Sequence, residues 1–181
     1  MKTTNKNIAI LGTAVLIVTA FVTGASPLAR AELSAPDTIK ILNNLIHTAK
    51  DAQDGYKTAA EGVAAADLKT LFSKKSQERM EFVTDLQNKV IQLGGVPEDE
   101  GTAKAAVYRG FMKVKAAVTQ GDAHAVVSET RQGEGAAVNA YEDALKTDLP
   151  GNVKPLIEDQ SKKVHDSLEE LKRLEAITKK S

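Results

Sequence analysis

The sequence lacks cysteine and tryptophan altogether, and only 4% of its 181 residues are aromatic. The absence of cysteine excludes a disulfide scaffold, a thiol nucleophile and a thiolate metal site. Lysine and arginine together number 24, as do aspartate and glutamate, and the basic residues form no run. Because nucleic-acid binding needs basic residues gathered on one face, we expect no nucleic-acid partner. The few aromatic residues and the many alanines favour a helical fold.

The N-terminal residues carry the pattern of an export signal. Two lysines precede an uncharged apolar run over residues 8–22, and the triplet Ala-Arg-Ala at 29–31 precedes the first acidic residue, Glu32. These three parts are typical of a secretory signal peptide with an Ala-x-Ala cleavage site. The sequence therefore predicts a cleaved signal peptide over residues 1–31, a mature chain over residues 32–181 and a periplasmic or secreted location.

The alternative to cleavage is a membrane anchor over residues 8–25. A spanning helix needs about 20 apolar residues, whereas this run holds 15 residues, or 18 when it is extended to Ala25. Its length favours cleavage, and hence no stable membrane insertion of the mature protein. The mature chain keeps 21 basic and 24 acidic residues. This mildly acidic balance does not favour binding to an anionic membrane.

The mature chain is predicted to be helical throughout. Apolar residues repeat at intervals of three and four, which only a helix turns into one stripe, in five segments: 37–66, 67–93, 102–119, 122–146 and 152–177. Glycine or proline separates several of these segments. Strand-like alternation of apolar and polar residues does not occur, so the sequence predicts an all-α fold.

Segment lengths predict the topology. Four of the segments would form helices about 40 Å long that can lie side by side. Short joints make the first two helices one antiparallel hairpin and the last two another. The intervening segment, 102–119, could cover about 27 Å and carry the chain back along the bundle. We therefore expect a ferritin-like four-helix bundle with a long helical crossover between helices two and four, which then run parallel.

Several short motifs occur in a fixed order along the chain. They are Asp54-Gly55-Tyr56, Arg79-x-x-Phe82, Leu93-Gly94-Gly95, Tyr108-Arg109-Gly110-Phe111, and Gly133-Glu134 followed by Tyr141. Over about residues 37–177 the set resembles a bacterial ferritin-like family filed as domain of unknown function 2383. The resemblance implies a ferritin-like four-helix bundle and implies no established reaction. An exported member departs from the cytoplasmic, stress-type bundle that the resemblance would otherwise suggest.

Charged residues from four helices are expected to meet at mid-height of this bundle. Residues that are equally distant from a short joint lie opposite each other in an antiparallel hairpin. On this basis Asp54 faces Arg79 across the first hairpin, and Glu134 faces His165 across the second. The parallel helices then place Arg79 level with Glu134. All four side chains would converge on one layer.

The favoured interpretation of this layer is structural. Arg79 would bridge Asp54 and Glu134 as a buried ion pair, with Tyr56 or Tyr141 completing the hydrogen bonds. Buried charges need partners, and these residues partner each other. Such a layer would fix the register of the helices rather than carry chemistry.

The alternative interpretation is a metal-binding ferritin-like protein with Glu78, Glu81, Glu134 and His165 as ligands. Carboxylates with one imidazole suit Fe, Mn or Zn. Against this site, the sequence contains no Glu-x-x-His, which di-iron bundles use on two helices. The guanidinium of Arg79 would also repel a metal ion. The pattern therefore favours the ion pair and no cofactor.

The sequence as a whole predicts an exported, non-catalytic protein of the cell envelope, either stress-related or acting through surface and oligomer contacts. Its partner would be a second copy of the chain or another envelope protein. The metal-binding protein described above is the alternative function.

Overall fold

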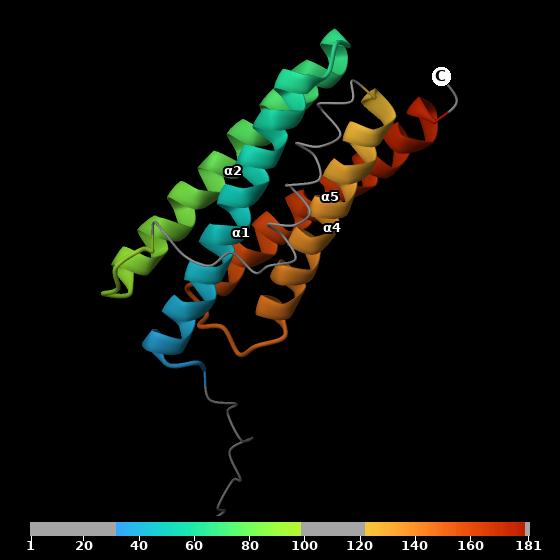
Figure 1. The fold of residues 1–181 in the computed structure, drawn as a ribbon. Helices are drawn as coiled ribbons and strands as arrows, with labels where there is room; N and C mark the ends of the chain where they lie inside the picture. Colours follow the sequence, from blue (N-terminus) through green and yellow to red (C-terminus); the bar gives the residue numbers. More distant parts are fainter. Residues whose placement is uncertain (1–31, 99–121, 180–181) are drawn as a thin grey trace, which may run out of the picture.

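Residues 32–98 and 122–179 are described by the computed structural model, and within them the chain forms four α-helices and no β-strand (Figure 1). The helices, labelled as in Figure 1, are α1 (Ala35–Gly62), α2 (Ala66–Gln92), α4 (Ala123–Leu145) and α5 (Lys154–Thr178). The described part of the chain confirms the predicted all-α fold.

Three predictions fall outside the described residues. They concern the signal peptide over 1–31, the alternative anchor over 8–25 and the crossover helix over 102–119. Within the four helices that are described, none is both long and apolar enough to cross a membrane.

Side-chain caps begin two of the helices. The Ser34 hydroxyl accepts a hydrogen bond of 3.3 Å from the backbone N–H of Asp37 at the start of α1. The Asp122 carboxylate accepts bonds of 2.8 and 3.2 Å from the N–H groups of His124 and Ala125 at the start of α4. Each oxygen satisfies backbone donors that have no partner inside the helix, which is why both helices begin where they do.

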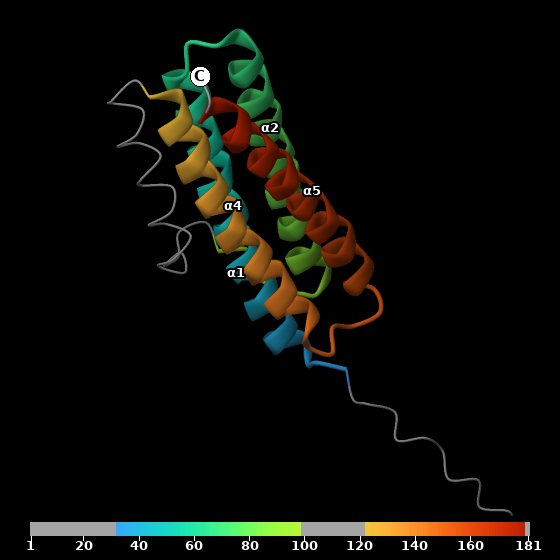
Figure 2. The ribbon, with the colours of Figure 1, turned by 90° about the vertical axis from the view of Figure 1, so that its right-hand side faces the viewer.

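The four helices form two antiparallel hairpins, α1–α2 and α4–α5, and α1 also packs against α4 (Figures 1 and 2). In both views α2 and α4 run in the same direction, while α1 and α5 run in the opposite one. The C-terminal end of α2 therefore lies at the opposite end of the bundle from the N-terminal end of α4.

The core consists of two clusters of buried apolar side chains. The first includes Ile46, Leu86 and Ile157, and the second includes Phe72 and Val127. The first cluster uses the beginning of α1 and the end of α2, whereas the second uses the end of α1 and the beginning of α2. The clusters thus occupy opposite ends of the bundle, and a layer of polar side chains lies between them.

A short strap ties the start of α1 to the loop between α4 and α5. The backbone N–H of Leu33 donates to the carbonyl of Asp148 at 2.8 Å, and the N–H of Gly151 donates to the carboxylate of Glu32 at 3.1 Å. The Leu33 side chain packs against the first core cluster. The folded domain therefore already includes Glu32.

Two glycines allow a matched test of backbone conformation. Gly94, which ends α2, has a φ of 79°, a conformation that a side chain disfavours by about 1–2 kcal/mol. We expect Gly94→Ala to lower the free energy of unfolding by about 1 kcal/mol, measured by urea denaturation followed by circular dichroism. Gly135 lies inside α4, and apart from its chain neighbours and the nearby backbone of its own helix no described atom lies within 4 Å of an added β-carbon. Gly135→Ala should raise stability by about 0.5–1 kcal/mol. Effects of the same sign in the two variants would show that backbone conformation does not distinguish these positions.

Candidate functional site

The centre of the bundle contains a fully buried ion pair between Arg79 on α2 and Glu134 on α4. Their side chains are 1% and 0% exposed. The Nη2 atom of Arg79 donates a hydrogen bond to Oε1 of Glu134 and a second one, of 3.1 Å, to the hydroxyl of Ser167 on α5. A charge in the protein interior is stable only when it is paired and hydrogen-bonded, and each member of this pair provides that for the other.

Aromatic rings enclose the Arg79 guanidinium. Its central carbon lies 4.7 Å from the centroid of the Phe82 ring and 5.8 Å from that of the Tyr56 ring. A planar guanidinium suits such cation–π contacts better than a lysine ammonium does. Burial disfavours the charged form of Arg79, but attraction to Glu134 outweighs it and keeps the pKa of Arg79 above its ordinary value. Arg79 is thus a permanent cation inside the bundle.

The two predicted tyrosines are buried and interact electrostatically with this pair. Tyr56, from α1, is fully buried, and burial together with the negative charge of Glu134 holds its pKa well above the ordinary value. Tyr141 donates a hydrogen bond of 2.9 Å to Gln160 on α5, and burial likewise raises its pKa. Both phenols are therefore neutral side chains of the interior, and all four helices contribute to the polar layer.

Asp54 does not join the layer, so the predicted Asp54–Arg79 pair is wrong. Its side chain is exposed. The Ser76 hydroxyl donates to the carbonyl of Gln53 at 3.0 Å, where the predicted register would have placed Met80. The reason is the joint: α1 ends at Gly62, before the expected boundary, so α2 begins earlier and its register against α1 shifts by about one turn.

His165 is also displaced from its predicted position opposite Glu134. The Tyr141–Gln160 hydrogen bond fixes the register of the α4–α5 hairpin and places Ser167 opposite Glu134 instead. The His165 side chain is 45% exposed, and its Nε2 atom lies 3.2 Å from a carboxylate oxygen of Glu142. His165 therefore belongs to the surface.

The four residues of the predicted metal site do not come together. Glu134 is engaged by Arg79, Glu81 is exposed, His165 is on the surface, and Glu78 interacts with Arg79 and Lys75 at the edge of the bundle. Among the residues that the structure describes, no three His, Asp or Glu side chains are grouped so that they could hold a metal ion. With a guanidinium at the centre of the layer, this donor set does not fit Fe, Mn or Zn.

Sequence reasoning missed Gln160 and Ser167. Both are buried, and Gln160 also donates to the backbone carbonyl of Phe82 at 3.4 Å. Their position in the sequence indicated burial, because they fall on the apolar stripe of the last helix between Ile157, Val164 and Leu171. A polar residue on a buried stripe requires a partner from another helix.

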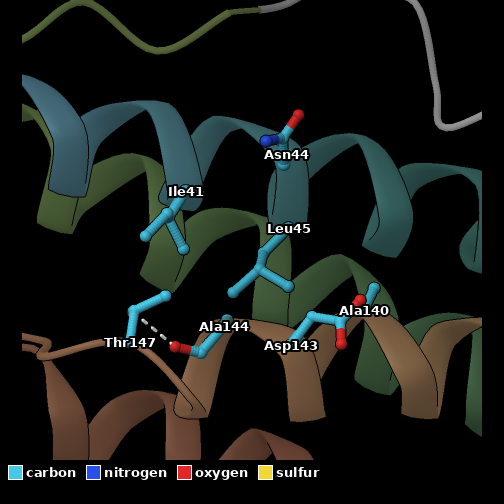
Figure 3. Close-up of a pocket in the computed structure, with 7 residues that line it drawn as sticks. All are labelled: Ile41, Asn44, Leu45, Ala140, Asp143, Ala144 and Thr147. Carbon is cyan, nitrogen blue, oxygen red and sulfur yellow. Dashed lines mark hydrogen bonds between the residues drawn. The ribbon is translucent and has the colours of Figure 1, made fainter.

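A shallow hollow lies between α1 and α4, with a volume of about 110 Å³. Figure 3 shows the residues that line it, which are Ile41, Asn44, Leu45, Ala140, Asp143, Ala144 and Thr147. Its lining is largely aliphatic, and the Thr147 hydroxyl is already bonded to the carbonyl of Ala144 at 2.6 Å. Ligand sites usually enclose about 300–1,000 Å³, so this hollow is smaller than a typical small-molecule site.

The ion pair predicts a large effect of unpairing one charge. In Arg79→Met, Glu134 would remain buried without its cation, and we expect the free energy of unfolding to fall by about 3–5 kcal/mol in urea denaturation. Lys162→Met removes the exposed pair with Asp166 and serves as the matched control, which should leave stability almost unchanged. Equal losses in the two variants would show that burial of the pair has no energetic consequence.

Asp51 on α1 predicts a pH-dependent effect. Burial, and secondarily the charge of Asp54, raise the pKa of Asp51 from 3.8 to about 6, against an opposing effect of His47. The charged form is therefore penalised in the folded state, and this group's contribution to stability falls as the pH rises from about 4 to about 6. Asp51→Asn, which is neutral at every pH, should be more stable than the wild type at pH 8 and similar to it at pH 4.

Thermal unfolding of both proteins across this pH range measures the difference. Asp85→Asn, at an exposed position of α2, is the control and should show no such trend. A gain from Asp51→Asn that stays constant between pH 4 and pH 8 would refute the assignment.

Comparison with known proteins identifies the family. The family model described as a domain of unknown function (DUF2383) matches residues 37–147. This range covers α1 except its first two residues, all of α2 and α4, and both Arg79 and Glu134. It ends before α5, so the last helix lies outside the match, although the sequence resemblance was expected to reach residue 177. A search of curated proteins gave no match. The chain belongs to the DUF2383 family.

Proposed function

We propose that this protein is an exported, non-catalytic helical bundle with ferritin-like connectivity that acts through its surface in the cell envelope or outside the cell. The observation that carries the proposal is the Arg79–Glu134 pair. The position at which ferritin-like proteins bind metal ions is here taken by a cation and a carboxylate that neutralise each other. Groups committed to each other in this way support a role in fixing the fold.

The direction of the helices supports ferritin-like connectivity. Because α2 and α4 are parallel, the chain between them has to return along the bundle. A helix over residues 102–119 would cover about 27 Å of that distance. One long crossover between two hairpins is the arrangement of ferritin-like bundles.

Export is supported by the leader pattern over residues 1–31 and by the strap that follows it. Cleavage after Ala31 would make Glu32 the first residue, and Glu32 already contacts the α4–α5 loop. Removal of the leader would therefore leave the contacts of Glu32 and Leu33 with the α4–α5 loop in place. Surface contacts with a second copy or with another envelope protein, in an envelope stress response, are the role that we propose for the mature protein.

One preparation tests both parts of the proposal. The full chain is expressed in a bacterial host, recovered from the exported fraction without affinity tag or chelator, and analysed by intact-mass spectrometry. We expect a mass that corresponds to a chain starting at Glu32. A protein that stays in the cytoplasm with residues 1–31 attached would contradict export.

The same material is then incubated with Fe(II), Mn(II) or Zn(II), desalted and subjected to elemental analysis. We expect no stoichiometric metal, and we expect Glu134→Ala to differ from the wild type in stability only. Glu158→Ala, which removes an exposed partner of Lys154, is the matched control. Near-stoichiometric metal that is lost in Glu134→Ala and kept in Glu158→Ala would overturn the proposal and make metal binding the leading function.

A further inference from the structure

The chain that leaves α2 is fastened to α1 at Glu98. The backbone N–H of Glu98 donates to Oδ1 of Asn43 at 3.3 Å, and a carboxylate oxygen of Glu98 lies 3.2 Å from Nε2 of His47. Asn43 and His47 are four residues apart on α1 and so face the same way. One residue is therefore held at two points, through its backbone and through its side chain.

The two sides of this contact differ in burial. Asn43 and His47 are 5% and 7% exposed, whereas the side chain of Glu98 is 58% exposed. Buried polar groups need hydrogen-bond partners, and Glu98 supplies an N–H donor to the amide oxygen and an acceptor to the imidazole. Asn43 and His47 thus form a small binding site for an acidic residue on α1. The Glu98 side chain is already largely hydrated, so little change in its solvation accompanies its release from this site.

Two carboxylates act on His47. One is that of Glu98, and the other is that of Asp51, one turn further along α1, whose own neighbour is Asp54. Histidine is the side chain whose charge ordinarily changes between pH 5 and 8. A hydrogen bond from a protonated imidazole to a carboxylate is about twice as strong as a bond between neutral groups. The strength of the contact with Glu98 therefore depends on the proton of His47.

We propose that Asn43, His47 and Glu98 form a pH-sensitive latch, which holds the chain leaving α2 against α1 when His47 is protonated and loosens when His47 loses that proton. Asp51 contributes while it is charged, because the attraction between its carboxylate and His47, which opposes the rise in the pKa of Asp51, also favours the protonated imidazole. This inference is independent of the proposed export and surface role, since it concerns a conformational change within the fold.

Amide hydrogen exchange at Glu98 measures the latch directly. The isotope-labelled full chain, purified after export, is studied by NMR at pH 5.5 and pH 8, and each exchange rate is divided by the intrinsic rate at that pH. We expect the Glu98 amide to be about three- to tenfold better protected at pH 5.5. The amide of Leu86, in the core of α2, reports on global opening and corrects for any change in overall stability.

Two variants make the result decisive. His47→Gln keeps a donor for Glu98 but does not titrate. Glu98→Gln keeps the backbone bond to Asn43 but removes the carboxylate, at a position whose side chain is 58% exposed. Both should abolish the pH dependence of Glu98 protection. Equal protection at the two pH values in the wild type, or an unchanged pH dependence in either variant, would overturn the proposal.

Discussion

The rest of the structure depends on one constraint, that a charge placed inside a protein must be neutralised there. Arg79 enters the centre of the bundle from α2, and Glu134 meets it from α4. Ser167 on α5 accepts a further hydrogen bond from the same guanidinium nitrogen, and the Tyr56 ring on α1 lies against the guanidinium. All four helices are thereby held at one level, because each of them contributes to the contacts around the same side chain.

This layer explains how a core with few large side chains can have a single register. α4 is rich in glycine and alanine, and the aromatic content of the whole chain is only 4%. Packing between small apolar side chains is weakly directional, so such faces tolerate several relative positions of the helices. The Arg79–Glu134 pair does not, because a shift of one turn would leave two charges buried without partners. The pair thus joins two apolar clusters that would otherwise be packed independently.

The parts of the fold that were predictable from sequence are those that local chemistry determines. The spacing of apolar residues located all four described helices. The end of α1 was missed although Gly62 stands there as a stop signal, because residues 63–66 are Val-Ala-Ala-Ala and can continue a helix. That one boundary shifted the register of the first hairpin and placed Asp54 wrongly in the layer.

The composition of the layer was predictable only where strong chemistry required it. A buried arginine needs a carboxylate, and Glu134 was the acid that the parallel helices placed at its level. By contrast, the loop between α4 and α5 determines that Ser167, and not His165, lies opposite Glu134. The conformation of this loop shifts the register of the hairpin by two residues from the predicted one. The aromatic contacts of Arg79 depend on side-chain direction, which helical periodicity alone does not determine.

A double-mutant cycle between Arg79 and Glu134 tests the central claim most directly. Arg79→Met, Glu134→Leu and the combined variant are compared with the wild type by urea denaturation. If the two charges stabilise each other, each single change is severe while the combined variant recovers much of the loss, with a coupling free energy of about 2 kcal/mol or more. Additive losses, with a coupling free energy near zero, would show that the pair does not hold the bundle together.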